Sequence, residues 1–393
     1  MIRGNRGDLA SRYGILSQLH LLGFKDVTVF CDAASDIASL PYNRQPYGFV
    51  YNLIPRCQGL KKLVFADTVI WTGGIDLQDD SSLLKLCHTA CAFMAYRLLG
   101  KRVFVFMQGA GPISSKAGRM LVRLIVWLTN AFVARDSGSL QLLRAITGSS
   151  DKPILGYDGI FSGQFPGNGA TNADAALTSA FPNATNKKSA LTIGFNIRLW
   201  YHFSNGVLPY HIQRKAYQRR SQERMGRLID ASCLAIQDIL NRFPATIKLI
   251  SMYEPCAMTW EDDEPILSSI KQRFMHESRV LLPKESLGLH DFCSMVSALD
   301  CMVGMRLHAT LIALRFGVPS ITLNYTLKGR DIFRDRGLSE YVIELEDVIR
   351  SPAIVADKVN QALSDDNLES AIQSFNKKAY DKNQSIFETI LRD

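Results

Sequence analysis

The side chains best suited to chemistry lie in the last third of the chain, at the ends of two successive apolar runs. Arg306 and His308 follow the run 301–303, and Lys328 follows the run 320–323. Guanidinium and ammonium groups bind phosphate or carboxylate, and histidine exchanges a proton near neutral pH. If the two runs are neighbouring parallel strands, their carboxyl ends meet at one edge of a sheet. The cluster predicts a site for an anionic substrate with His308 as a proton carrier, and a buried structural histidine is the alternative.

Polar turns rich in glycine follow the apolar runs of the first half and could receive a second substrate. Glycine lets a ligand approach the backbone, and a carboxylate at a strand end can take a proton from a sugar hydroxyl. Asp79 is the candidate for that base, and helix capping by Asp79 or by Asp8 is the alternative. The residues of these turns are Asn5, Gly7, Asp8, Gly73, Gly74, Gln78, Asp79, Gln108 and Gly109.

Two further arginines, one in each half, end apolar runs in the same way. Arg135 follows the run 131–134, and Arg198 follows the run 192–196. A guanidinium at such a position could hold a carboxylate or phosphate, or could form a structural ion pair, as with Asp136 beside Arg135. We expect both arginines to help bind an anionic donor.

Short β-branched runs alternate with longer amphipathic ones, which predicts an α/β fold with parallel sheets flanked by helices. Strands are expected at 27–31, 68–71, 103–107, 131–134, 153–156, 191–196, 246–251, 279–282, 301–303 and 320–323. Helices are expected at 9–22, 82–99, 115–129, 136–146 and within 209–242. The acidic run 261–264 is expected to begin another helix, because negative charge is favourable at a helix N-terminus.

The alternation fails between residues 163 and 189, where Gly, Asn, Ala, Thr and Pro predominate. This divides the chain into an N-terminal Rossmann-like domain (1–163), a linker (164–190) and a C-terminal Rossmann-like domain (191–365). A C-terminal helix (366–393) could pack back on the N-terminal domain. With two such domains, the expected site is the cleft between them.

The composition fits a chain with a large core and excludes disordered and disulfide-stapled classes. Of 393 residues, 47% are hydrophobic and 21% are charged, and the formal net charge is +8. The eight cysteines form no CxxC pair and have no histidine at zinc-ligand spacing, so we expect reduced thiols and neither metal nor cofactor. Reduced thiols, and the lack of an uncharged apolar run of about 18 residues, favour a soluble cytoplasmic protein.

A basic stretch between Arg214 and Arg227 contains six Lys or Arg residues and one Glu. A solvated helix face is the ordinary explanation, and peripheral contact with an anionic membrane is the functional one. No nucleic-acid-binding motif accompanies the stretch, so we expect no nucleic-acid partner.

Taken in order, these motifs resemble the polysaccharide pyruvyl transferase family. The resemblance rests on Arg306-Leu307-His308-Ala309 with Tyr325-x-x-Lys328, on the turns described above, and on Arg135-Asp136 and Asp158. It implies a GT-B-like fold, in which two Rossmann-like domains face each other across a cleft. It also implies transfer of the pyruvyl group of phosphoenolpyruvate, as co-substrate, to two hydroxyls of one sugar, which forms a cyclic ketal and releases phosphate.

The resemblance also implies residue roles. Arg306, His308 and Lys328 would hold the donor, Arg135 would reach across from the N-terminal half, and Asp79 would face the acceptor. His308 and Asp79 would then be the acid and the base, in either order. The acceptor sugar would belong to a polysaccharide, an oligosaccharide or a lipid-linked precursor.

The sequence departs from the family pattern on the acceptor side. Thr72 stands where the family usually has a third glycine, Leu9 replaces an acidic residue, and the first strand is very short or missing. One alternative is a GT-B glycosyltransferase using a nucleotide sugar, for which Glu344 and Glu346 are the nearby carboxylates, neither at an obvious strand end. A non-catalytic glycan- or lipid-binding homologue is the other. A truncated eukaryotic chain would belong in the Golgi lumen rather than at the cytoplasmic face of a membrane.

Overall fold

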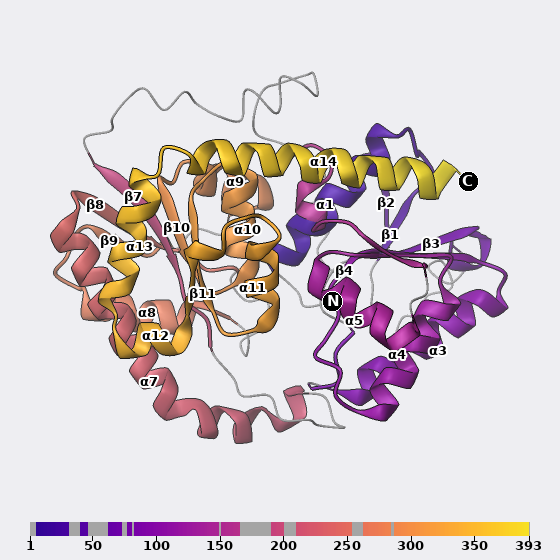
Figure 1. Cartoon of the computed structure of the whole chain (residues 1–393), viewed down its shortest axis with the longest axis horizontal. Coiled ribbons are helices and arrows are strands. Elements are labelled where there is room, and N and C mark those ends of the chain that lie inside the picture. The colour runs from indigo at the N-terminus through magenta and orange to yellow at the C-terminus, as the bar shows by residue number, and fades with distance from the viewer. Residues whose placement is uncertain are drawn as a thin grey trace.

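The computed structural model contains two main parallel β-sheets, each accompanied by helices (Figure 1). It describes residues 5–30, 40–45, 62–72, 77–80, 82–148, 151–165, 190–199, 210–253, 262–283 and 287–392. Gly73, Gly74 and most of the expected linker lie outside these residues. The α/β fold class predicted from the alternation of short and long runs is confirmed.

The N-terminal half contains a four-stranded sheet and a separate pair of short strands. Its elements are α1 (Arg6–Leu21), β1 (Thr28–Phe30), β2 (Asn43–Gln45), β3 (Thr68–Thr72), α3 (Leu83–Leu98), β4 (Arg102–Gln108), α4 (Lys116–Leu128), β5 (Ala131–Ala134), α5 (Ser137–Thr147), β6 (Pro153–Leu155) and η1 (Gly159–Phe161). The sheet has the order β3-β4-β5-β6, and β1 pairs with β2.

The sequence of strand β4 is a continuous apolar run, and the packing of the strand explains why. Val103 and Val105 belong to a core formed with α3, α4 and α5, whereas Phe104 and Phe106 belong to a second core shared with the C-terminal half. Both faces of the sheet are therefore buried, which requires apolar residues at consecutive positions.

The C-terminal half contains a six-stranded parallel sheet. Its elements are β7 (Leu191–Asn196), α7 (Tyr210–Arg242), β8 (Ala245–Leu249), α8 (Glu264–Arg273), β9 (Val280–Leu281), α9 (Leu289–Ser297), β10 (Cys301–Gly304), α10 (Leu307–Arg315), β11 (Ser320–Asn324), α11 (Leu327–Arg334), η2 (Ser339–Tyr341), β12 (Val342–Glu344), α12 (Leu345–Arg350) and α13 (Ala353–Ser364). The strand order is β12-β11-β10-β7-β8-β9. The chain thus builds outward from β7 to β9, returns to pair β10 with β7, and continues to β12.

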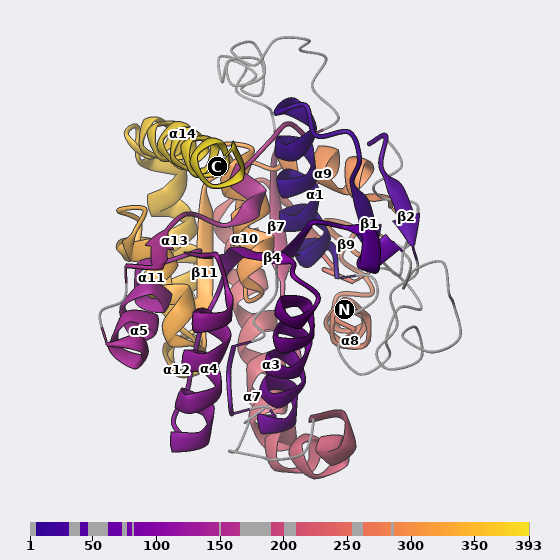
Figure 2. The same ribbon diagram turned by 90° about the vertical axis from the view of Figure 1, so that its right-hand side faces the viewer.

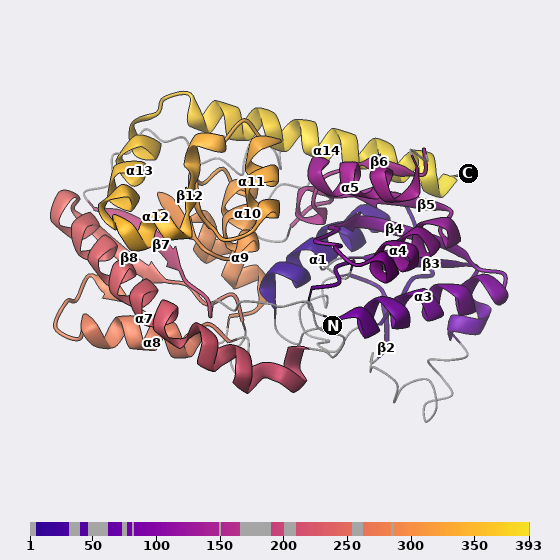
Figure 3. The same cartoon turned by 60° about the horizontal axis from the view of Figure 1, so that its bottom comes forward.

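Two helices connect the halves, and both lie toward the same side of the molecule (Figure 2). Helix α1 packs against η1 of the N-terminal half and against α9 and α10 of the C-terminal half. The last helix, α14 (Leu368–Arg392), runs along both halves (Figures 1 and 3). Its Phe387 stacks on Phe106 with ring centroids 4.5 Å apart, and its Asn383 Oδ1 accepts from Tyr157 N at 2.9 Å. These contacts fix the position of the N-terminal sheet relative to the C-terminal one.

Each strand expected from the sequence is present within about two residues of its expected bounds. The sequence pattern does not reveal β2 and β12, because three residues are too few to show a period-2 alternation. Glu344 therefore ends a strand, contrary to expectation, and its carboxylate accepts from Asn324 Nδ2 at 3.0 Å and from Arg330 Nη2 at 2.8 Å. Asn5, and not Asp8, caps the first helix, because its Oδ1 accepts from Gly7 N at 3.0 Å.

Candidate active site

The strand order of the C-terminal sheet indicates where a ligand should bind. The direction of strand addition reverses between β7 and β10, and open α/β sheets bind ligands beyond the carboxyl ends of strands at such a reversal. Arg198 follows β7, and Arg306 and His308 follow β10. Three of the predicted donor-site residues are thus brought to this point.

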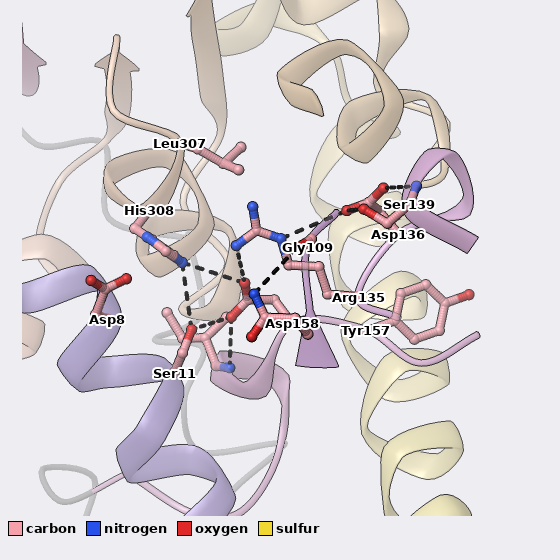
Figure 4. A network of polar contacts seen from close by, with 12 residues as sticks. Asp8, Ser11, Gly109, Arg135, Asp136, Ser139, Tyr157, Asp158, Leu307 and His308 are labelled. Atoms are coloured by element: carbon pink, nitrogen blue, oxygen red, sulfur yellow. Dashed lines mark hydrogen bonds and ion pairs between the residues drawn. The ribbon is translucent and has the colours of Figure 1, made fainter. Parts of the chain in front are cut away.

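A buried carboxylate of the N-terminal half meets the C-terminal half at the same place. Asp158 caps η1, and its Oδ1 accepts from Ile160 N at 3.1 Å and from Ser11 Oγ. Its Oδ2 lies 3.4 Å from His308 Nε2 and 3.5 Å from Arg135 Nη1. Figure 4 shows these side chains converging from α1, from the segments after β5 and β6, and from the start of α10. Among the described residues, His308 is the only histidine of the predicted site. This network connects its imidazole to both halves of the chain.

His308 is held in the first turn of α10 by close contact with α1. The imidazole is 15% exposed, whereas the Asp158 side chain is 3% exposed. A Cβ placed on Gly7 would lie 2.3 Å from His308 Cβ and 2.5 Å from its Cγ, well inside contact distance. Only glycine therefore fits at position 7 without separating α1 from α10.

The pKa of Asp158 lies well below its usual value. Burial alone would raise the pKa, but the hydrogen bond and charge of His308, the charge of Arg135 and the hydrogen bond of Ser11 outweigh burial. Asp158 is thus anionic. Because a carboxylate only accepts hydrogen bonds, Nε2 of His308 carries the proton in this contact.

Arg135 is fully buried beneath this network. Its Nε lies 3.6 Å from Asp136 Oδ2, and Asp136 in turn caps α5 by accepting from Ser139 N at 2.7 Å. Gly109 leaves room for the guanidinium, because a Cβ there would lie 2.9 Å from Arg135 Nε. Within the part of the chain that the structure describes, Arg135 Nη2 is buried and has no hydrogen-bond partner. Buried donors are normally satisfied, so an unpaired Nη2 at this position is unusual.

A second buried guanidinium, that of Arg336, lies close to the network without having been singled out by the sequence. It stacks over the rings of Phe375 and Phe161, 4.4 and 4.9 Å from the ring centroids. Burial lowers the pKa of Arg336 to about 10, and the charge of Asp158 acts in the opposite direction. Arg336 follows a helix rather than a strand, so the pattern of cations at strand ends does not mark it.

The Arg306 guanidinium is paired with a buried carboxylate, so it has a structural contact in addition to its predicted role in donor binding. Its Nε lies 2.8 Å from both carboxylate oxygens of Asp263, and its guanidinium lies 4.5 Å from the ring centroid of Tyr253. Asp263 also accepts from Asn196 Nδ2 at 3.2 Å and from Met252 N at 3.1 Å. The predicted helix does begin at Glu264, but Asp263 makes no side-chain cap and instead joins the ends of three strands. Burial raises the pKa of Asp263, and the charge of Arg306 opposes this.

Arg198 and Tyr325 meet beside this cluster. Arg198 Nη1 donates to the Tyr325 hydroxyl at 2.9 Å, and both side chains are partly exposed. Lys328 belongs to the first turn of α11, but its side chain lies outside the described part of the structure. Its predicted contact with a donor therefore stays a prediction.

Asp79 has a different environment from the one a base facing a sugar would need. Its carboxylate accepts from Ser115 N and Ser115 Oγ, both at 2.7 Å, and from Ser114 N at 2.9 Å. Burial alone would raise the pKa of Asp79, but the hydrogen bonds of Ser115 and Ser114 outweigh it and lower the pKa. Asp79 thus braces the turn that leads into α4. Ser82, and not Asp79, caps α3. Within the described residues, Asp79 makes no contact with the His308 network.

The remaining predicted residues that the structure describes lie in the N-terminal half. Asn5 Nδ2 donates to Asp8 Oδ2 at 3.0 Å, and Asp8 follows Gly7, which lies against His308. Gln108 Nε2 donates to the carbonyl of Gly109 at 3.2 Å, within the N-terminal turn. Gln78 is partly buried in the segment before α3.

The basic stretch lies in the first half of α7, where Arg219, Arg224 and Arg227 are exposed. In the described part of the chain, no three His, Cys, Asp or Glu side chains are placed to hold a metal ion. None of the described helices is long and apolar enough to span a membrane.

Comparison with known proteins assigns the family. The family model of polysaccharide pyruvyl transferases matches residues 5–326, which include Asp158, Arg306 and His308. The chain belongs to the polysaccharide pyruvyl transferase family. As a member of this family, it is a transferase. A curated relative, the amylovoran biosynthesis protein AmsJ of Erwinia amylovora, is 22% identical over 329 residues, which cover 83% of this chain and 72% of AmsJ.

Solved structures similar to this pyruvyl transferase support the GT-B-like architecture. A UDP-GlcNAc 2-epimerase of Neisseria meningitidis bound to UDP-GlcNAc matches with a TM-score of 0.55 at 13% identity, covering 99% of this chain and 98% of the epimerase. A glycosyltransferase of Rickettsia africae matches with a TM-score of 0.55 at 10% identity, covering 98% and 95%. At such identities the likeness concerns the fold alone.

Three residues of the site escaped the sequence reasoning in different ways. Ser11 is one small polar residue inside a helix that is buried along most of its length, and nothing in its spacing marks it. Arg6 pins α1 to the C-terminal half, with Nη1 donating to Ser251 O at 2.9 Å and Nη2 to Leu287 O at 3.1 Å. Asp263 could have been suspected from its position in an acidic run, but its pairing with Arg306 spans elements far apart in the chain.

Proposed function

We propose that this pyruvyl transferase moves the pyruvyl group of phosphoenolpyruvate onto two hydroxyls of one sugar in a polysaccharide, oligosaccharide or lipid-linked precursor. The product is a cyclic ketal, and phosphate is released. The observation that carries the proposal is the His308–Asp158 pair at the junction of the two halves, at the strand reversal of the C-terminal sheet. It offers a proton carrier at the position where this fold binds its ligands.

The proposed reaction needs two proton movements. Forming two C–O bonds at C2 of phosphoenolpyruvate releases two hydroxyl protons, while the C2–O bond to phosphate breaks. One proton ends on C3, which becomes a methyl group, and the other ends on the released phosphate. A single group that gives a proton to C3 and regains one from a hydroxyl closes this balance.

His308 is our candidate for that group. Asp158 orients the imidazole, because the carboxylate is buried, anionic and 3.4 Å from Nε2. Ser11 and Arg135 hold Asp158 in place, so they act as positioning residues. This arrangement replaces the predicted pair of His308 and Asp79, because the Asp79 carboxylate is occupied by Ser114 and Ser115.

The donor carries a phosphate and a carboxylate, and the proposed site offers several positive groups. The first N–H groups of α10, at Leu307 and His308, lie at a helix N-terminus, which favours anions. Arg198 and the buried Nη2 of Arg135 flank this end from the two halves, and Lys328 is proposed to join them from α11. Arg306 is proposed to hold the turn that presents these groups, through Asp263.

The acceptor is proposed to approach from the start of α1. Asn5 caps this helix, and Asp8 belongs to its first turn, next to Gly7, which lies against His308. Both side chains are partly exposed, unlike that of Asp79, which is 4% exposed. Asp8 is therefore better placed than Asp79 to contact a sugar hydroxyl.

The test is an assay of the full chain with phosphoenolpyruvate and a panel of nitrophenyl hexosides. We expect phosphate release and a ketal product detected by mass spectrometry, both dependent on the hexoside and unaffected by a chelator. A parallel series with UDP-sugars in place of phosphoenolpyruvate tests glycosyl transfer. Sugar transfer from a nucleotide, or phosphate release without a ketal product, would contradict the proposal.

A further inference from the structure

The N-terminal half exposes a concentration of large apolar side chains. Of the thirteen large hydrophobic side chains that are exposed in the described part of the chain, eight lie between residues 64 and 127. The most exposed are Leu98 at 88%, Phe65 at 80%, Trp127 at 70% and Met120 at 67%. Single exposed apolar residues are ordinary, but a cluster of them marks an interaction surface.

The sheet topology gathers most of these side chains at one edge. Phe65 precedes β3, Leu98 and Leu99 precede β4, and Trp127 precedes β5, and these strands are parallel neighbours. Their amino ends therefore share one edge of the sheet. Asp158 and the candidate site lie beyond the carboxyl ends, at the opposite edge.

Helices α3 and α4 extend this edge along the outside of the domain. They pack against each other on one face of the sheet, as Figures 1 and 3 show. Met120 lies on the exposed side of α4, two turns before Trp127. We define the outer surface as Phe65, Leu98, Leu99, Met120 and Trp127.

The charge around the outer surface has one dominant sign. Neither α3 nor α4 contains an acidic residue. In the described residues from 62 to 152, two carboxylates, those of Asp67 and Asp151, are exposed. The exposed cations of the same residues are Lys62, Lys85, Arg97, Arg102, Lys116, Arg119, Arg123, Arg144 and Lys152.

We propose that the outer surface docks on an anionic lipid membrane, with Phe65, Leu98 and Trp127 entering the interfacial region. Aromatic and leucine side chains surrounded by Lys and Arg suit a bilayer surface, where apolar groups insert and cations attract acidic headgroups. Because the site lies at the other edge of the same sheet, docking leaves it uncovered. The proposal does not depend on the proposed reaction, and it concerns a surface distinct from the basic stretch of α7.

The charge pattern favours a membrane over a second copy of the chain. Two copies meeting through this surface would bring the exposed cations that adjoin it in sequence, among them Lys62, Arg97 and Arg102, against the same cations of the other copy, which opposes association. A soluble anionic ligand would use the cations but would leave the 70% exposed indole of Trp127 and the 88% exposed Leu98 without a role.

Vesicle flotation with the full chain tests the proposal. Vesicles of phosphatidylcholine alone are compared with vesicles containing about one-third phosphatidylglycerol, at low and high salt. We expect salt-sensitive binding to the anionic vesicles. The double variant Leu98→Ser/Trp127→Ser should partition at least about tenfold more weakly, because it removes two inserting side chains. The variant Lys62→Glu/Arg102→Glu, which changes exposed cations before β3 and at the start of β4, should weaken binding by roughly fivefold or more for each cation lost.

Matched controls separate this surface from other exposed groups. Leu234→Ser/Met275→Ser changes two apolar residues of α7 and the segment after α8 that are 61% and 67% exposed, and should bind like wild type. Arg219→Glu/Arg227→Glu, on the basic stretch of α7, should also bind like wild type. Absence of vesicle binding, or binding lost only in the α7 variant, would overturn the proposal. It would also fall if Leu98→Ser/Trp127→Ser converted a dimer to a monomer in sedimentation equilibrium.

Discussion

Two buried aspartates of the N-terminal half, Asp158 and Asp79, have lowered pKa values for different reasons. Asp79 is satisfied locally, by the backbone and hydroxyl groups of the two serines that lead into α4. Asp158 is held by a serine of α1, an arginine after β5 and a histidine of the C-terminal half. Both residues are almost inaccessible to solvent, at 4% exposure for Asp79 and 2% for Asp158, so solvent exposure does not distinguish them.

The difference shows what marks a functional carboxylate in this fold. A carboxylate that receives hydrogen bonds from its own turn stabilises that turn and leaves no titratable partner. A carboxylate that is contacted by side chains from three separate elements, one of them a partly exposed imidazole, can orient a proton-carrying group where the two halves meet. We therefore expect variants of Asp79 to lower mainly the free energy of unfolding, and variants of the Asp158–His308 network to lower mainly turnover.

The largest expected change in stability is at Arg306, the cation that the sequence favoured for donor binding. Arg306→Ala leaves the Asp263 carboxylate buried without its cation, and the free energy of unfolding should fall by about 3–5 kcal/mol. Urea denaturation followed by circular dichroism measures this. Arg330→Ala, which breaks the half-exposed pair with Glu344, is the control and should cost less than about 1 kcal/mol. If Arg306→Ala were as stable as wild type, Arg306 would again be a free donor-binding residue.

The contact between Gly7 and His308 supplies a second test of the Asp158 region. Gly7→Ala adds a methyl group within 2.6 Å of three His308 atoms and must displace the imidazole or α1. Turnover should fall roughly ten- to hundredfold, because catalytic groups misplaced by about 1 Å lose that much rate. Gly226→Ala is the control, since no atom lies within 4 Å of the added Cβ. Normal turnover in Gly7→Ala would show that catalysis does not need His308 where the structure places it.

Sequence reasoning reached most of the fold and part of this site. The alternation of apolar runs located ten strands, because strands buried on both faces must be apolar throughout. It also located His308, because His308 comes soon after a strand and its place at the sheet edge follows from the sequence alone. It did not identify the partners of Arg306 and His308, because Asp263 and Ser11 approach them only through tertiary packing. Asp79 was favoured as a base because it follows a strand, as a site residue would. The hydrogen bonds that it accepts from Ser114 and Ser115, which argue against that role, are visible only in the folded structure.

A third test compares the pH dependence of folding in Asp158→Asn and wild type. The pKa of Asp158 in the folded state is lowered, so its contribution to stability is present above about pH 4, the ordinary pKa of aspartate. That contribution is lost as the pH falls below this value. Below about pH 4, the unfolding free energy of wild type should decline more steeply than that of Asp158→Asn, by up to about 1.4 kcal/mol per pH unit. Parallel curves from urea titrations would contradict the assignment.

The smallest expected effect on turnover is at Asp79. Asp79→Asn removes a hydrogen-bonded carboxylate from the turn before α4, so the free energy of unfolding should fall by about 1–3 kcal/mol. At saturating substrates its turnover should stay within about twofold of wild type at a temperature where the variant is folded, since no group of the His308 network contacts Asp79 in the described residues. A collapse of turnover with unchanged stability would restore Asp79 as the base.

We propose that His308, oriented by Asp158, carries the proton to C3 of phosphoenolpyruvate. The direct measurement is turnover of His308→Gln at saturating donor together with calorimetric titration of phosphoenolpyruvate, because glutamine can still donate a hydrogen bond but cannot deliver a proton. We expect turnover to fall by about 10²–10⁴-fold with a much smaller change in affinity. Near-normal turnover, or a loss confined to donor affinity, would contradict the claim and leave His308 as a binding residue.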